Sequence, residues 1–237
     1  MQHNVNRQNT DLKIFETGLR FVPGGENELI QESVIGRLVT GKRFEENWSN
    51  ESADADLFDL KGDIESLAEL ATGEAIEFCA SNQGFLHPGV SGDIVVADEV
   101  VGWYGQLHPK FLTSLDLSQQ PLLFEIRLDA LSGAKLTSYQ EISRYPSVRR
   151  DLALLVPTET SNKVLVDTVR KYAPNTLQNV LTFDVYEGEN IEKGKKSVAL
   201  GLILQEFSRT LEETEVDQAV SSILDGLSQD LGAGLRA

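Results

Sequence analysis

The alternation of hydrophobic and polar residues over the first half of the chain predicts antiparallel strands around a single helix. The helix is expected over residues 58–71, because Leu60, Ile64 and Leu67 recur at helical spacing. The first strand is interrupted at Gly18, where a bulge or a close approach of another segment is expected. The predicted strands are residues 12–21, 33–40, 75–79, 93–97, 100–104 and 124–128, with a turn at 23–25 and a tight one at 98–99.

The second half has a βαββαβ pattern, with strands at residues 150–156, 180–186, 197–205 and 234–236. One helix is expected over 162–172, and a second opens with Thr210 and Glu213 at capping-box spacing. This order predicts a ferredoxin-like sandwich with both helices on one face of the sheet. Residues 130–145 have few large apolar side chains, so we divide the chain into domains 1–138 and 139–237. The predicted fold class is α+β.

Period-two alternation in the second predicted strand of this half separates its two faces. Leu181, Phe183 and Val185 are expected beneath the helices, which leaves Thr182, Asp184 and Tyr186 on the open face beside Ser197 of the next strand. An aromatic ring with a carboxylate and a hydroxyl beside it can receive an unstacked nucleic-acid base. The alternative interpretation is that Tyr186 only covers the open side of the sheet.

Basic residues are expected around this face. Arg144, Arg149 and Arg150 precede or begin the first strand of the second half, and the antiparallel third strand brings Arg209 to the same end. Lys193, Lys195 and Lys196 occupy the loop at the other end. Each alone is most often a solvated charge, but together they could contact phosphates that flank a bound base.

The composition opposes nucleic-acid binding by bulk charge, because the formal net charge is −16. Residues 1–138 carry 10 Lys and Arg against 22 Asp and Glu, or −12, whereas residues 139–237 carry 11 against 15, or −4.

The single cysteine, Cys79, excludes an internal disulfide and is expected in the core. No Cys and His spacing predicts a metal site, and no apolar run predicts a membrane segment or a secretory signal, so we expect a cytoplasmic protein.

Several segments resemble, in order, the beta subunit of bacterial phenylalanyl-tRNA synthetases. They are residues 6–21, 58–63, 87–89, 105–109, 141–151, 183–186 and 204–211. The resemblance implies the C-terminal part of that subunit: a class II synthetase-like domain, cut at its N-terminal side, followed by an anticodon-binding domain. It further implies phenylalanine tRNA and a catalytic alpha subunit as partners, two copies of each subunit, and ATP and magnesium as requirements of the whole enzyme. The family often has a polar or basic residue after His-Pro-Gly, where this chain has Val90.

The first half lacks the cationic residues that amino-acid activation needs to hold ATP phosphates. Arg20 and Arg37 lie on the hairpin strands, but neither forms an Arg-x-Glu pair, and no glycine-rich arginine segment follows residue 128. We therefore expect no catalytic residue and no cofactor in this chain, and we expect Trp48 and Trp103 to anchor the alpha subunit. Two other hypotheses stay open at this point: a small-molecule sensor, and a purely structural module without RNA contact.

Overall fold

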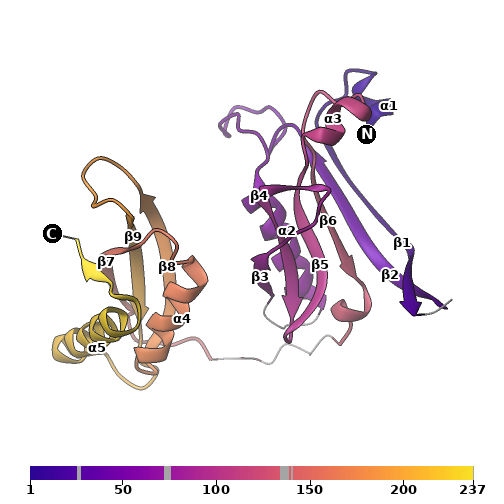
Figure 1. Cartoon of the computed structure of the whole chain (residues 1–237). Coiled ribbons are helices and arrows are strands. Elements are labelled where there is room, and N and C mark those ends of the chain that lie inside the picture. The colour runs from indigo at the N-terminus through magenta and orange to yellow at the C-terminus, as the bar shows by residue number, and fades with distance from the viewer. Residues whose placement is uncertain (26–27, 72–75, 134–138, 140, 237) are drawn as a thin grey trace. The chain divides into compact units, whose positions relative to one another are not determined.

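The computed structural model describes residues 1–25, 28–71, 76–133, 139 and 141–236. The chain forms two compact units, Met1–Ser138 and Tyr139–Ala237, each with its own sheet and core (Figure 1). The predicted α+β class, an antiparallel sheet domain followed by a ferredoxin-like one, is confirmed.

The sheet of the first unit has six strands in the order β1-β2-β6-β5-β4-β3, and all neighbouring pairs are antiparallel. The strands are β1 (Leu12–Gly25), β2 (Glu28–Thr40), β3 (Glu77–Ala80), β4 (Leu86–Val96), β5 (Glu99–Leu107) and β6 (Leu122–Arg127). Three short helices accompany them: α1 (Gln2–Val5), α3 (Lys110–Ser114) and the 3₁₀ turn η1 (Asp129–Leu131).

Helix α2 (Leu57–Ala71) covers one face of this sheet, close to its predicted limits. Leu60 and Ile64 are fully buried against the β5 and β6 side chains Tyr104, Phe124 and Ile126. Asp56 accepts hydrogen bonds from the backbone N–H groups of residues 58 and 59, which satisfies the start of the helix. Asp56 therefore stabilises the beginning of the helix.

Three local predictions for the first unit are wrong. β1 continues through Gly18, which pairs with Val34, and its irregularity lies instead between Pro23 and Gly25, so residues 23–25 belong to the strand. Cys79 is exposed, because the short strand β3 lies at the sheet edge. The two-residue turn between β4 and β5 is Ala97-Asp98, one position earlier than predicted, and both residues have positive φ. Position 75 of the predicted third strand lies outside the described residues.

The second unit has a four-stranded antiparallel sheet in the order β10-β7-β9-β8, the order of a ferredoxin-like sandwich. Its elements are β7 (Val148–Pro157), α4 (Asn162–Tyr172), β8 (Leu177–Tyr186), β9 (Lys195–Leu204), α5 (Glu213–Leu231) and β10 (Gly234–Leu235). Both helices pack on one face, where Leu165 and Val169 of α4 and Ile223 of α5 meet the buried strand residues Leu154 and Leu200. The opposite face carries no helix of this unit (Figure 1).

The start of α5 differs from its prediction. The capping box joins Glu212 and Glu215, whose side chains each accept from the backbone N–H of the other residue. Thr210 and Glu213 therefore do not form it. The spacing rule placed the box two residues too early, because Thr210 and Glu213 fit the Ser/Thr-x-x-Glu pattern, whereas Glu212 caps the helix in place of the usual Ser or Thr.

Candidate nucleic-acid interface

The open face of the second sheet displays residues from two different registers of β8. Leu181 pairs with Gly201, whereas Asp184 pairs with Ala199 and Tyr186 with Ser197, because the register shifts between Thr182 and Asp184. Phe183 is the extra residue of this β-bulge. From Asn179 to the bulge the odd-numbered side chains face out, and after the bulge the even-numbered ones do.

The bulge corrects the predicted alternation of β8. Asp184 and Tyr186 lie on the open face as predicted, but Leu181 and Phe183 lie there too, 41% and 52% exposed. Thr182, predicted on the open face, lies on the helix side and donates its hydroxyl hydrogen bond to Asn162 at the start of α4, 2.7 Å away. Val185 is on the helix side as predicted, although its position beyond the helices leaves it exposed. A strict period of two cannot anticipate an inserted residue.

The side chain of Arg149, from β7, lies across the neighbouring strand β9 on this face. Its Nε donates to Asp151 over 2.7 Å, and its guanidinium carbon is 5.2 Å from the centre of the Phe183 ring. It passes over Gly201, where a Cβ would lie 3.2 Å from both Nε and Nη2 of Arg149. The absence of a side chain at Gly201 thus allows an arginine of β7 to reach an aromatic residue of β8.

Arg236 makes a second contact of this kind from the other edge of the sheet. Its guanidinium carbon lies 5.3 Å from the centre of the Tyr186 ring, and its Nη1 lies 3.5 Å from the Ser197 hydroxyl. Ser197 is consequently only 5% exposed, so it is on the predicted face but is covered rather than available to a ligand. Tyr186 itself is 38% exposed, which contradicts burial beneath a helix.

Arg236 and Phe183 are the residues of this face that sequence reasoning missed. Arg236 is adjacent to β10, and its backbone N–H donates to Ala153 of β7, which turns its side chain over the open face. That register could not be read from a strand of two residues. Phe183 was assigned to the wrong side because the bulge leaves no signal in the hydrophobic pattern.

Two of the predicted basic residues point away from the open face. Arg150 pairs with buried Leu202 on the helix side of the sheet and makes an ion pair with Glu213 of α5. Arg209 holds Glu215 through two contacts, and these hydrogen bonds raise the pKa of Arg209. The same contacts, with the backbone N–H of Glu212, lower the pKa of Glu215 to about 2. Both arginines therefore stabilise the beginning of α5, and their predicted place around the open face is wrong.

The remaining predicted cations lie at the two ends of the unit. Arg144 precedes β7 and is highly exposed, with only a 3.7 Å contact to Glu141. Lys193, Lys195 and Lys196 belong to the loop and the first residues of β9, and Lys195 forms an ion pair with Glu192. The charge of Arg144 is thus highly accessible, since its side chain is 86% exposed.

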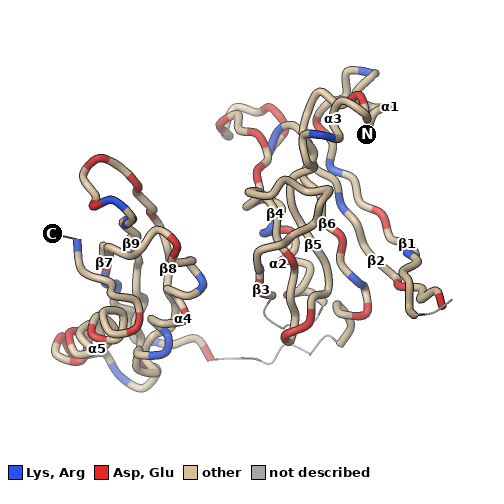
Figure 2. The backbone as a smooth tube through the Cα atoms, in the orientation of Figure 1, with Lys and Arg blue, Asp and Glu red and all other residues tan. Residues whose placement is uncertain are grey.

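The acidic residues of the second unit gather on the opposite side. Six of its 15 carboxylates lie on or cap α5, on the helix-covered side of the sheet (Figure 2): Glu212, Glu213, Glu215, Asp217, Asp225 and Asp230. On the open face, Arg149 and Arg236 balance Asp151 and Asp184. The net charge of the unit therefore does not describe the charge of its open face.

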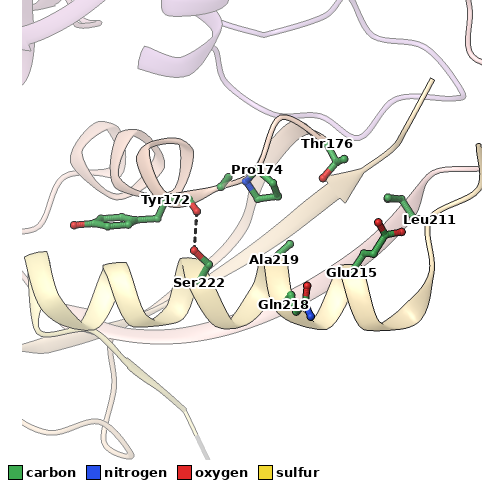
Figure 3. Close-up of a pocket in the computed structure, with 9 residues that line it drawn as sticks. Tyr172, Pro174, Thr176, Leu211, Glu215, Gln218, Ala219 and Ser222 are labelled. Carbon is green, nitrogen blue, oxygen red and sulfur yellow. Dashed lines mark hydrogen bonds between the residues drawn. The ribbon is translucent and has the colours of Figure 1, made fainter. Parts of the chain in front are cut away.

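A hollow of about 410 Å³ lies on the helix side, between the end of α4 and α5 (Figure 3). Two of its polar groups already have partners in the chain: Ser222 donates to the carbonyl of Tyr172, and Glu215 is held by Arg209. The carboxylate and the hydroxyl are thus engaged in holding the fold. The hollow gives no support to the small-molecule sensor hypothesis.

Arg20 and Arg37 of the first unit are paired with carboxylates. Arg20 contacts Glu32 and Glu125, at 2.6 and 2.5 Å, and Arg37 contacts Asp63 of α2 at 2.9 Å. These two were the hairpin arginines considered for ATP phosphates. Each would have to leave a carboxylate partner before it could hold a phosphate.

The face of the first sheet opposite α2 carries an apolar groove of about 280 Å³. Ile14, Leu38, Leu123 and Trp103 line it, and Phe85 packs edge-on against Trp103 with ring centres 4.9 Å apart. Trp48 is 99% exposed in an irregular segment. Neither tryptophan is buried, so both keep the accessibility that a partner contact requires.

No three His, Cys, Asp or Glu side chains of the described residues come together as a metal site. None of the helices in the described part of the chain has the length and apolar character that a membrane crossing requires.

The second unit is an α+β sandwich whose uncovered sheet presents aromatic rings beside arginines. This arrangement is typical of sheet domains that stack unpaired bases. Comparison with known families gives the particular assignment. Residues 1–128 match the model described as phenylalanyl tRNA synthetase beta chain CLM domain, and residues 143–236 match the ferredoxin-fold anticodon binding domain. The chain belongs to the phenylalanyl-tRNA synthetase beta chain family and contains its anticodon-binding domain.

Individual relatives agree with this assignment. The phenylalanine–tRNA ligase beta subunit of Pasteurella multocida is 39% identical over 239 residues, covering 100% of this chain and 30% of that protein. The corresponding subunit of Vibrio cholerae is 38% identical over 237 residues, covering 99% and 30%. The chain therefore spans under a third of the length of these curated relatives.

Proposed function

We propose that the second unit binds the anticodon of phenylalanine tRNA on its open sheet face. The observation that supports this most is the placement of Asp184 and Tyr186 side by side on an uncovered sheet, with an arginine against the Tyr186 ring. Sheets that bind single-stranded RNA use such a surface, because every base has a face that can stack and an edge that can be read.

The residues of the face have different roles in this proposal. Tyr186 stacks one base, and Asp184 accepts hydrogen bonds from the ring N–H and amino group of a guanine. Arg149 and Arg144 contact phosphates, which position the RNA without reading its sequence. Ser197 is a positioning residue, since it is buried beneath Arg236. Arg150 and Arg209 are engaged with α5 and make no essential RNA contact.

For the whole protein, we propose the activity that the names of the relatives state, the ligation of phenylalanine to its tRNA. That reaction uses ATP, with magnesium, and takes place in the cytoplasm on a catalytic alpha subunit, in an assembly of two alpha and two beta subunits. The first unit supplies no catalytic residue and packs on the alpha subunit. The apolar groove beside Trp103 and the exposed Trp48 support this, because aromatic residues are enriched at protein interfaces.

The test is a binding titration of the 237-residue chain with phenylalanine tRNA and with a tRNA altered only in its anticodon, at two salt concentrations. We expect the unaltered tRNA to bind more tightly at both. Asp184→Ala should reduce the ratio of the two affinities roughly 5- to 150-fold, because one base-edge contact contributes about 1–3 kcal/mol of discrimination. Asp225→Ala is the matched control, since it removes the same charge from the exposed surface of α5.

Equal binding of both tRNAs by the unmodified chain would leave the purely structural interpretation standing. A loss of preference in Asp225→Ala as large as that in Asp184→Ala would show that net charge, rather than a base contact, governs the effect.

A further inference from the structure

We infer that Phe183 and Arg149 form a second base-stacking platform, so that the open face holds two consecutive unpaired nucleotides rather than one. One base lies at Tyr186 and its neighbour in the RNA lies at Phe183. This inference rests on the proposed RNA-binding function and specifies the ligand as a splayed dinucleotide step within a single-stranded loop.

The β-bulge is the first observation that supports the second platform. Thr182 pairs with Leu200 and Asp184 with Ala199, so Phe183 and Asp184 together oppose one residue of β9. In a regular strand, only one of the two sets, Leu181 with Phe183 or Asp184 with Tyr186, could face outward. The bulge brings both sets to the same face, and bulges of this kind re-aim side chains at binding sites.

Phe183 contributes its ring to the open face rather than to the core of this unit. The side chain is 52% exposed, although a buried phenylalanine would gain about 1.5–3 kcal/mol from leaving water. The helix side of the sheet has a complete core without it. A large aromatic residue that the backbone is distorted to display is better explained by a ligand than by packing.

Arg149 gives this platform a guanidinium group that is held in place beside the Phe183 ring and carries a positive charge. Its Nε–H···Oδ1 bond to Asp151 and the missing side chain at Gly201 hold the guanidinium against the sheet and beside the Phe183 ring. The bond to Asp151 uses Nε, which leaves the Nη hydrogens directed to other acceptors such as a phosphate. The platform therefore combines a ring for a base with a cation for the adjoining backbone.

The arrangement repeats around Tyr186. There, Arg236 crosses β9 at Ser197, as Arg149 crosses it at Gly201, and each guanidinium ends about 5 Å from the ring it contacts. The two rings flank Asp184 on β8. Phe183 and Asp184 together oppose Ala199 and Tyr186 opposes Ser197, so the two ring positions lie two residue steps of β9 apart, or roughly 7 Å. That is about twice the ~3.4 Å spacing of stacked bases in a strand. The two bases must therefore be unstacked from each other, as in bound single-stranded RNA.

The experiment measures binding of the 237-residue chain to the anticodon stem-loop of phenylalanine tRNA and to versions with one abasic anticodon position each. Phe183→Ala and Phe183→Leu should weaken binding of the intact stem-loop roughly 5- to 150-fold, and Phe183→Tyr should bind as the unmodified chain does. Phe183→Leu keeps an apolar side chain of similar bulk, so it separates loss of stacking from loss of folding. Val185→Ala is the control on the same strand, equally exposed but on the helix side, and should have no effect.

Abasic positions identify the base that each ring holds. The loss of affinity caused by Phe183→Leu should disappear when one anticodon position is abasic, and the loss caused by Tyr186→Ala should disappear when the adjacent position is abasic. The reason is that a ring cannot contribute stacking energy when the base that it contacts is missing. If Tyr186→Ala weakens binding but Phe183→Leu and Phe183→Ala do not, the second platform is refuted and the anticodon function stands. A Phe183→Leu loss that no abasic position removes also refutes it. If the unmodified chain does not bind the stem-loop, the proposed function itself fails.

Discussion

The two units use arginine in different ways, although each places helices on one face of an antiparallel sheet. In the first unit, Arg20 and Arg37 are enclosed by carboxylates of neighbouring strands or of α2. In the second, Arg149 and Arg236 lie against aromatic rings on the face without helices. Arg149 also bonds Asp151, but through Nε alone, so its Nη groups stay available to a ligand. The carboxylates around Arg20 engage both its Nε and its Nη1.

This difference explains how a chain with a net charge of −16 can have a surface suited to RNA. Binding depends on the cations at the contact and not on the sum over the molecule. The first unit combines apolar Ile14, Leu38 and Trp103 with arginines whose charge is taken up by neighbouring carboxylates, which suits a protein partner. The second confines much of its acidity to α5 and keeps arginine on the open face.

Among the variants that test this comparison, Tyr186→Ala is expected to have the largest effect on RNA binding. Removal of the ring should weaken binding of phenylalanine tRNA roughly 5- to 150-fold, because stacking of one base contributes about 1–3 kcal/mol. Titration by fluorescence anisotropy measures it, with Tyr186→Phe as the variant that retains the ring. Binding by Tyr186→Ala as tight as that of the unmodified chain would remove the ring from the RNA site.

A smaller effect, but a sharper contrast, is expected between Arg149→Ala and Arg20→Ala. Arg149→Ala should weaken binding of all tRNAs alike and reduce the slope of log affinity against log salt by about 1, as for the loss of one phosphate contact. Arg20→Ala should leave both quantities unchanged, because Arg20 is held by Glu32 and Glu125. Equal salt slopes in the two variants would contradict the distinction between paired and ring-supported arginines.

The smallest effect concerns acid stability of the second unit. The pKa of Glu215 falls from 4.5 to about 2 on folding, mainly through its hydrogen bonds from Arg209. A carboxylate with a lowered folded pKa stabilises the fold fully above its unfolded pKa, and that contribution is lost as the pH falls toward the folded value. Between about pH 4.5 and pH 2, the thermal midpoint of this unit should therefore decline more in the unmodified chain than in Glu215→Gln.

Calorimetry at a series of pH values provides the measurement. Glu213→Gln is the control, since it removes a neighbouring carboxylate that contacts Arg150 rather than Arg209. Parallel decline in the unmodified chain and in Glu215→Gln would mean that the Arg209 contact does not contribute to the acid sensitivity.

Sequence alone determined those features that depend on periodic burial. Helices α2 and α4 have nearly their predicted limits, because apolar residues at helical spacing must face a core. The βαββαβ order of the second half similarly specified the ferredoxin-like sheet, and the ordered family segments specified the relatives. Asp184 and Tyr186 were placed on the open face by period-two alternation, which holds for the part of β8 that follows the bulge.

Tertiary structure alone decided which side chains complete that face. One inserted residue at Phe183 reversed the facing of Leu181 and Thr182, and only the pairing with β9 fixes where a bulge lies. Arg236 reaches Tyr186 because a two-residue strand pairs with β7, a contact between segments far apart in the sequence. Arg209 turned toward α5 because Glu215 of that helix lies within reach. Long-range contacts of this kind have no local periodicity, so no pattern along the chain could have specified them. Arg150 differs, because the alternation of β7 already puts it on the helix side with buried Leu152 and Leu154.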